Sequence, residues 1–214
     1  MGKITDTQLQ EMIQMQDEMN QKVSSDWRNK DWDWDLAAQM ELMEGVEHWG
    51  YKWWKQQTPD LPQVQLEVVD AFHFWLSGAI ASEELLVGHT VDNINRLVDS
   101  AHYSNWGVEA KGRVLKVIAT DYKELIRHQE NWADLLNAVD LTPYDLYIMY
   151  IQKNVLNHFR QDNGYKTGEY TKIWLGEEDN VHLLELSHQL TAEGTFSKDN
   201  LYTALAERYA EVSS

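Results

Sequence analysis

The feature that most constrains the fold of this chain is the scarcity of residues that interrupt helices. Only three Pro and eleven Gly occur among the 214 residues. Apolar residues recur every three or four positions, whereas the alternation of apolar and polar residues that is typical of strands is not sustained over a useful length. We therefore predict an all-α fold, and the length fits one domain over residues 1–214.

The predicted helices follow from this periodicity and from capping signals. Residues 62–77 are apolar most of the way round, with Pro62 in the first turn, so this helix should be buried. Thr142 suits a helix N-cap and Pro143 the position after it. Residues 56–62 and 163–176 should be loops because Pro or Gly interrupts them. The predicted helices span residues 5–23, 35–55, 62–77, 91–104, 108–136, 142–161, 178–190 and 198–212.

Charge and cysteine content exclude several classes of protein. The chain has 35 acidic and 18 basic residues, a formal net charge of −17, and no Cys. Disulfides, thiolate metal sites and a Cys nucleophile are therefore excluded, and so much acid disfavours nonspecific nucleic-acid binding. We see neither a secretory signal nor an apolar run long enough to span a membrane. We therefore expect a cytoplasmic protein, of a cell or a phage-infected host, that contacts neither nucleic acid nor membrane.

Two pairs of acidic residues stand out on neighbouring predicted helices. Glu41 and Glu44 lie three residues apart, and so do Glu67 and Asp70. Residues three apart lie side by side on a helix, so two such pairs on packed helices would make a cluster of carboxylates. Such a cluster repels itself unless a hard cation binds it, and oxygen ligands without Cys or clustered His indicate Mg²⁺ or Mn²⁺.

A solvated helix face is the usual reason for a Glu-x-x-Glu pair, but two observations favour a metal site here. Residues 31–51 and 56–95 contain neither Lys nor Arg, which a solvated face would supply. The second pair also lies in a mostly apolar helix, where unpaired carboxylates are costly. Glu47, one further turn along, could be a ligand, a supporting group or plain surface.

A later segment gathers the positive charge that the rest of the chain lacks. Lys153, Asn157 and Arg160 share one predicted helix face, and Tyr165 and Lys172 follow across a glycine-containing loop. Arg and Lys here could bind an anion such as phosphate. The alternative is a helix C-terminus whose basic residues complement its dipole. No P-loop motif is present. We call the segment from Lys153 to Lys172 the basic arm. A carboxylate cluster together with this arm suggests that the ligand is a nucleotide polyphosphate, bound through Mg²⁺.

Several segments match, in the same order along the chain, the motifs of a known family. They are Met15–Asp17 with Asn20, Glu41-x-x-Glu44, YKWWK at 51–55, Glu67-x-x-Asp70-x-x-His73-Phe74, NGYKTGEYTKIW at 163–174, Gly176 and Glu178–Asn180. The chain thereby resembles the dimeric all-α dUTPases of the all-α NTP pyrophosphohydrolase superfamily. The resemblance implies a helical bundle, a homodimer, and Mg²⁺-dependent hydrolysis of dUTP, and of dUDP, to dUMP by a metal-activated water.

The resemblance also implies roles for individual residues. Glu41, Glu44, Glu67 and Asp70 would be the Mg²⁺ ligands, with Mn²⁺ as a possible substitute, and Glu44 would also activate the attacking water. The phosphate-binding residues would be Lys153, Asn157, Arg160, Tyr165 and Lys172, some of them reaching across the dimer interface. The candidates for base and sugar contacts are Gln16, Asn20, Trp53, His73 and Asn180.

Parts of this assignment have alternatives. A lone His on an apolar helix, such as His73, is more often a core residue than a ligand, and helically spaced Trp residues are more often core than base-stacking platforms. Some phage members of the family also hydrolyse dCTP, so a dCTP/dUTP pyrophosphatase is an alternative. A second alternative is a non-catalytic acidic helical protein that binds a regulator, although it accounts for neither the paired carboxylates nor the basic arm.

Overall fold

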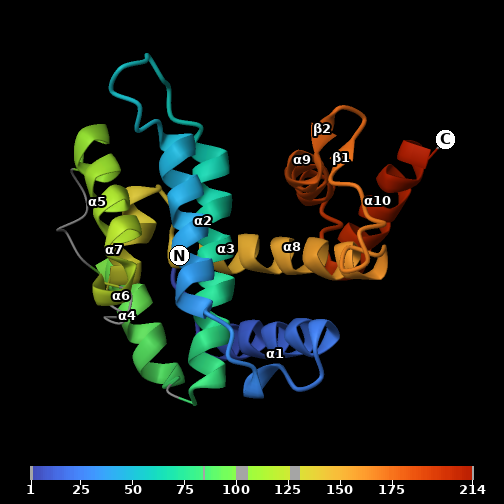
Figure 1. The fold of residues 1–214 in the computed structure, drawn as a ribbon, viewed down its shortest axis with the longest axis horizontal. Helices are drawn as coiled ribbons and strands as arrows, with labels where there is room; N and C mark the ends of the chain where they lie inside the picture. The colour runs from blue at the N-terminus through green and yellow to red at the C-terminus, as the bar shows by residue number, and fades with distance from the viewer. Residues whose placement is uncertain (1, 84, 100–105, 126–130, 214) are drawn as a thin grey trace. The chain divides into compact units, whose positions relative to one another are not determined.

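The computed structural model describes most of the chain, and its backbone is dominated by helices (Figure 1). The described residues are 2–83, 85–99, 106–125 and 131–213. Within them, the strands are limited to one hairpin of two residues per strand, so the predicted all-α class is confirmed.

The elements follow one another in this order: α1 Asp6–Val23, η1 Trp27–Asn29, α2 Trp34–Trp49, α3 Leu61–Ala81, α4 Val87–Asp99, α5 Val108–Thr120, α6 Tyr122–Leu125, α7 Asn131–Ala138, α8 Pro143–Asp162, β1 Ile173–Trp174, β2 Glu177–Glu178, α9 Asp179–Ala192, α10 Lys198–Ala210 and η3 Glu211–Ser213.

The chain divides into two compact units. The first consists of Met1–Asp17 and Arg28–Tyr150, and the second of Glu18–Trp27 and Ile151–Ser214. Helices α1 and α8 each contribute residues to both units. A single domain over residues 1–214 stays a prediction.

The first unit is built around the antiparallel pair α2 and α3, which the 50–60 loop joins (Figure 1). The N-cap of α2 is Asp33, whose side chain accepts a hydrogen bond from the Leu36 N–H. Helix α3 starts with Pro in its first turn and is buried over most of its circumference, as predicted. Helix α5 packs on α2, and Gly112 allows this contact because a Cβ there would lie 2.3 Å from Trp49 Nε1.

Some predicted helix boundaries in this unit are wrong. Helix α2 ends at Trp49 rather than at residue 55, because Gly50 takes the left-handed conformation, with φ of 91°, and caps it. The predicted helix over 108–136 is interrupted, since α5 ends at Thr120 and α7 begins at Asn131. Residues 126–130 lie outside the described residues, as do residues 100–104 of the helix predicted over 91–104.

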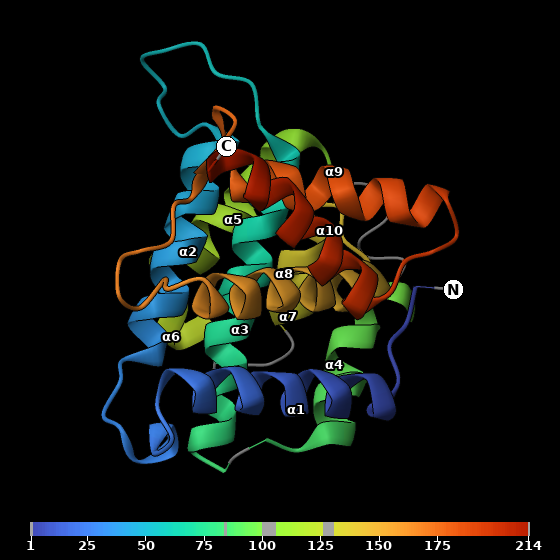
Figure 2. The same cartoon turned by 90° about the vertical axis from the view of Figure 1, so that its right-hand side faces the viewer.

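The second unit packs α9, α10 and the last turns of α8 around a core of aliphatic and aromatic residues (Figure 2). Phe159 of α8 contacts Trp174 of β1, with ring centroids 5.8 Å apart. Thr142 caps α8, as predicted, and forms a capping box with Asp145, while Ser197 caps α10. The core residues are Val155, Leu156, Phe159, Tyr170, Trp174, Leu183, Leu186, Leu201 and Leu205.

Strand β1 and the hairpin turn lie in the segment over 163–176 that we predicted as a loop. Strand β2 follows it and ends at Glu178, where we predicted the start of a helix. Ile173 pairs with Glu178 and Trp174 with Glu177, so only two residues connect the strands. These two, Leu175 and Gly176, have φ of 50° and 94°, the conformation of the tight turns that suit hairpins. Strands of two residues are too short for an alternating pattern to reveal.

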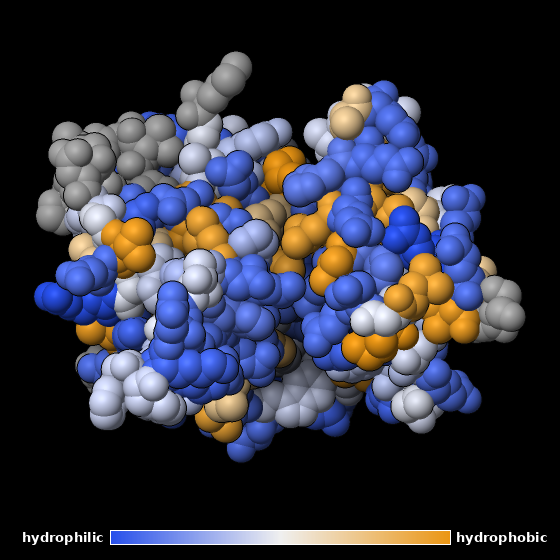
Figure 3. Space-filling model, turned by 90° about the horizontal axis from the view of Figure 1, so that it is seen from above, coloured by the Kyte–Doolittle hydropathy of each residue, from blue (hydrophilic) through white to orange (hydrophobic). Residues whose placement is uncertain are grey.

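The surface is mixed in character. Figure 3 shows hydrophilic residues over most of the visible face, with hydrophobic groups between them. Across the four described ranges, no helix combines the length and the apolar character that crossing a membrane requires.

Candidate functional site

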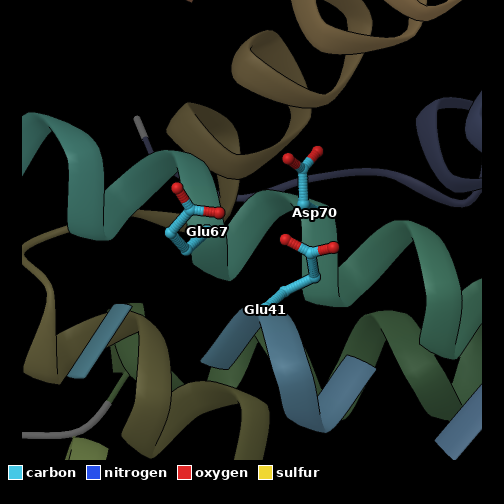
Figure 4. Close-up of side chains that lie close together, drawn as sticks. All are labelled: Glu41, Glu67 and Asp70. Atoms are coloured by element: carbon cyan, nitrogen blue, oxygen red, sulfur yellow. The ribbon is translucent and has the colours of Figure 1, made fainter. Parts of the chain in front are cut away.

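Three predicted metal ligands come together in the first unit. Glu41 lies on α2, and Glu67 and Asp70 lie one turn apart on α3, with one carboxylate oxygen of each within 4.8 Å of the others (Figure 4). We call these residues the acidic triad. The triad forms because the i, i+3 pair on α3 lies beside Glu41 on the helix packed against it.

The environment of the acidic triad favours a divalent cation. Glu67 is only 7% exposed, and Glu41 and Asp70 are half-buried. Two carboxylates at this spacing repel each other by about 3 kcal/mol at an effective dielectric constant of about 20. A bound cation would reverse this repulsion, and a donor set made of oxygen alone suits hard cations such as Mg²⁺. The residues present therefore fit a divalent metal ion.

The other acidic residues of α2 do not belong to the triad. Glu44 is exposed and lies one turn beyond Glu41, with its carboxylate open to water. Glu47 is exposed as well, and its carboxylate lies 2.7 Å from Lys52 Nζ, which lowers the pKa of Glu47 through this hydrogen bond and the Lys52 charge. Glu47 is thus a surface ion pair. The His48 imidazole borders the triad, with Nε2 3.8 Å from Glu67 Oε1.

The predicted phosphate-binding residues of α8 lie together in the second unit. Lys153, although 1% exposed, directs its ammonium group to Asn180, where Nζ donates to Oδ1 at 2.7 Å. Arg160 lies two turns along the same helix, and its Nη1 donates to Asn157 Oδ1 at 3.1 Å. Its Nη2 lies 3.4 Å from Asn180 Oδ1, so the Asn180 amide oxygen joins the two cations. We call Lys153, Asn157, Arg160 and Asn180 the cationic group.

A buried carboxylate already compensates this group. Asp179 is 1% exposed and accepts two parallel hydrogen bonds from Arg160, both 2.8 Å long, and one from the Tyr170 hydroxyl, 2.7 Å long. Burial alone would raise the pKa of Asp179, but the hydrogen bonds and the charge of Arg160 outweigh it and hold this pKa below its ordinary value. Together with Asp179, the cationic group holds two cations and one anion, a net positive charge.

The remaining predicted phosphate-binding residues, Tyr165 and Lys172, lie at the edge of the cationic group. Two cations lie near the Tyr165 ring, with Arg160 Cζ 5.9 Å and Lys172 Nζ 5.8 Å from its centroid. Tyr165 and Lys172 are both exposed, so a ligand could reach them. The structure thus brings all five predicted phosphate-binding residues into one neighbourhood of the second unit.

Two of the predicted base or sugar contacts, Gln16 and His73, lie in a buried polar network of the first unit. Gln16 Nε2 donates to Ser77 Oγ at 2.9 Å, and the Tyr150 hydroxyl lies 2.7 Å from Gln16 Oε1. His73 stacks on Tyr150 at a centroid distance of 3.9 Å, and its Nδ1 lies 2.8 Å from the Val69 carbonyl. The packing of His73 agrees with the core alternative, and its contact with a nucleotide stays a prediction.

The other base and sugar candidates occupy different surroundings. Asn20 is buried in the second unit, and Asn180 is half-buried within the cationic group. Trp53 is 90% exposed in the 50–60 loop, where its ring packs edge-on against that of Trp54. Its exposure leaves the indole face open to a ligand.

The supporting contacts of the site were not predicted from the sequence, although Asp179 belongs to the Glu178–Asn180 motif. Asp179 and Tyr170 orient Arg160, while Tyr150 and Ser77 orient Gln16. The signal for Asp179 was its place in the Glu178–Asn180 motif, directly before Asn180. The partners of Gln16 lie 61 and 134 positions away, so no local pattern could reveal them.

A family model described as dUTPase matches residues 8–165 of the chain. A search of curated proteins found no match to the chain. The matched range holds the acidic triad, Glu44 and the α8 part of the cationic group, and it ends at Tyr165. It also covers well over half of the chain, and the helical fold agrees with it. The chain therefore belongs to the dimeric all-α dUTPase family and is a dUTP diphosphatase.

Proposed function

We propose that the chain hydrolyses dUTP to dUMP and pyrophosphate with Mg²⁺ as its metal, and that it also accepts dUDP. The observation that carries the metal assignment is the acidic triad, with three carboxylate oxygens within 4.8 Å of one another on two packed helices. Glu41, Glu67 and Asp70 would hold the ion together with Glu44. When bound, Mg²⁺ lowers the pKa of a coordinated water and neutralises phosphate charge.

Glu44 is proposed as the base of the reaction. Its carboxylate is exposed to water and lies one helical turn from the triad. A Glu44 oxygen would accept the proton of the attacking water as the water oxygen bonds to phosphorus. The bond between the phosphorus and the bridging oxygen then breaks, and pyrophosphate leaves with the released electron pair. With dUDP, the same step releases phosphate.

The cationic group, with Tyr165 and Lys172, is proposed to bind the phosphate chain, from the same protomer or its partner. Arg160 supports this role because its Nη1 donates to a neutral amide oxygen, Asn157 Oδ1, which a phosphate oxygen could replace as acceptor. The Arg160 fork, held by Asp179, is preorganised and loses little freedom when a phosphate binds. Base and sugar contacts are proposed for Gln16, Asn20, Trp53, His73 and Asn180.

A homodimer is proposed as the working form. Leu36, Met40 and Met43 follow one another along α2 at helical spacing, and each is at least 40% exposed. A second copy of the chain would bury this apolar stripe. Sedimentation should show a dimer at micromolar concentration and a monomer for Met40→Glu. A monomeric wild-type chain would contradict the proposal.

The activity is tested by incubating the protein with dUTP, dUDP, dCTP and the other deoxynucleotides, with Mg²⁺ or with EDTA. We expect turnover of dUTP and dUDP with Mg²⁺ and none with EDTA. Comparable turnover of dCTP would instead indicate the broader pyrimidine specificity, and turnover unaffected by EDTA would refute the metal requirement.

The role of Glu44 is tested with Glu44→Gln, which removes the basic oxygen but keeps the shape of the side chain. Turnover should fall by roughly a hundredfold or more, while calorimetry should still detect dUTP binding with Mg²⁺. Glu47→Gln is the matched control on the same helix. Turnover by Glu44→Gln at the wild-type rate would exclude Glu44 as the base.

A further inference from the structure

We infer that α10 positions the loop that carries Lys172, and that it does so through Arg208 and Tyr209. The inference rests on the proposed role of Lys172 in phosphate binding. The matched family range ends at Tyr165, so both α10 residues lie beyond it. Figure 1 shows the β1–β2 hairpin with α9 and α10, the elements that these contacts join.

The first connection runs from Arg208 through His182 to the hairpin. Arg208 Nη1 lies 2.8 Å from His182 Nδ1, and His182 Nε2 lies 2.8 Å from the Trp174 carbonyl oxygen. A guanidinium can only donate, so Nδ1 accepts and the imidazole proton sits on Nε2, from which it is donated to Trp174. The chain of hydrogen bonds thus has one consistent direction, from α10 to β1.

Packing fixes the His182 ring in this orientation. The ring is buried and stacks on the Trp174 indole, with centroids 5.5 Å apart and planes inclined by 19°. Glu185 Oε2 lies 3.2 Å from Arg208 Nη1 and thereby holds the guanidinium on the exposed side. The same oxygen is 3.9 Å from His182 Nδ1, too far for a hydrogen bond.

The second connection is made by the next residue of α10. The Tyr209 hydroxyl accepts a hydrogen bond, 3.2 Å long, from the backbone N–H of Thr171. Its ring stacks on Tyr170, with centroids 5.2 Å apart, and also contacts Trp174 at 5.1 Å. Arg208 and Tyr209 therefore hold residues on both sides of Lys172.

Contacts within the loop carry this constraint to Lys172. Trp174 Nε1 donates to the Thr171 carbonyl at 2.8 Å, and the Asp179 N–H donates to the Lys172 carbonyl at 2.8 Å. The Lys172 backbone is thus fixed while its side chain stays exposed. Binding a phosphate costs conformational entropy, because both the Lys side chain and its loop become ordered. When the backbone is already fixed, the loop contributes less to this cost.

The test compares Arg208→Met and Tyr209→Phe with Lys172→Met by steady-state kinetics on dUTP. Each α10 variant loses one hydrogen-bonding group and keeps most of its packing. We expect KM to rise about threefold to tenfold in each, with kcat changed less than twofold. Arg208→Lys should restore part of the loss, and Glu207→Gln, its exposed neighbour on α10, should leave KM unchanged.

The double variants separate positioning from general stability. In a Lys172→Met background, which itself raises KM, adding Arg208→Met or Tyr209→Phe should change KM less than twofold, since the positioned group is gone. Additive effects in the double variants, or an unchanged KM in both α10 variants, would overturn the inference while leaving the phosphate role of Lys172 intact. An unchanged KM in Lys172→Met would overturn that role and the inference with it. If thermal unfolding shows that Arg208→Met does not fold, the Tyr209→Phe cycle decides alone.

Discussion

The acidic triad and the cationic group differ in whether residues of opposite charge accompany their charged side chains. In the triad, Glu41, Glu67 and Asp70 bring like charges within 4.8 Å of one another on two packed helices. In the cationic group, the carboxylate of Asp179 accepts hydrogen bonds from the nearly buried Arg160 and from Tyr170, while Lys153 donates to Asn180. An added cation would offset the negative charge of the triad, whereas Asp179 already offsets part of the positive charge of the cationic group.

This difference bears on how the charge of each site affects the stability of the fold. Each site keeps a net charge opposite to that of its proposed ligand, but only in the triad do like charges lie within 4.8 Å of one another. Substitutions in the two sites should therefore move the free energy of unfolding in opposite directions, even when both impair catalysis.

The largest expected effect is on turnover in the variant Glu67→Gln. Loss of one proposed metal ligand should lower kcat/KM by about a thousandfold, equivalent to about 4 kcal/mol of transition-state stabilisation. In EDTA, the same variant should be more stable than wild type by about 1 kcal/mol, because repulsion within the triad is relieved. Kinetics with Mg²⁺ and urea unfolding with EDTA check the two parts.

Glu47→Gln serves as the control for this variant, because Glu47 is an exposed ion pair outside the triad. Its activity should stay within twofold of wild type. A Glu67→Gln variant that is both active and destabilised would refute the contrast between the two sites.

The second expected effect is a loss of stability in Asp179→Asn. This change leaves the nearly buried Arg160 without its paired anion, so the free energy of unfolding should fall by about 2–3 kcal/mol. Urea denaturation at neutral pH, with or without Mg²⁺, measures it. A loss below about 0.5 kcal/mol would mean that the ion pair contributes little.

The pH dependence of this difference gives a third, smaller effect. Because the pKa of Asp179 is lower in the folded chain than its ordinary value of 3.8, the unfolded chain takes up the proton first. The stabilisation is therefore complete above about pH 5 and is lost as the pH falls below 3.8 towards the folded pKa. The stability advantage of wild type over Asp179→Asn should shrink over that range, and a constant difference down to about pH 3 would contradict this account.

The smallest expected effect concerns the turn of the hairpin that follows Lys172. Leu175 has φ of 50°, which a branched side chain adopts with strain, and it is 57% exposed. Leu175→Asn gives the Asn-Gly sequence that this turn favours and should stabilise the protein by about 0.5 kcal/mol. Thermal unfolding should show a rise of about 1–2 °C, while a fall would indicate that the Leu175 side chain stabilises the turn.

Features set by neighbouring residues were predictable from the sequence. The cap at Thr142 gave the start of α8 correctly, because it is formed locally with Asp145, three residues along the chain. The acidic triad was predictable in the same way, since two of its members lie one turn apart on one helix. Only its contact with Glu41 needed the packing of a second helix.

Features set by distant residues could not be predicted in this way. The end of α2 was missed because Gly50, in a tract of aromatic residues, interrupts a pattern that otherwise continues. The pairing of Arg160 with Asp179 joins residues 19 positions apart across a loop, and that of Arg208 with His182 spans 26 positions. Only the folded second unit brings these pairs together.

The central claim is that the acidic triad binds the divalent cation, and Mn²⁺ binding followed by electron paramagnetic resonance tests it most directly. Without nucleotide, the wild-type chain should bind Mn²⁺ in competition with Mg²⁺, and Glu47→Gln should bind it equally well. Asp70→Asn, which removes one charge from the triad, should bind Mn²⁺ at least about tenfold more weakly. Equal Mn²⁺ affinity in Asp70→Asn and wild type would contradict the account.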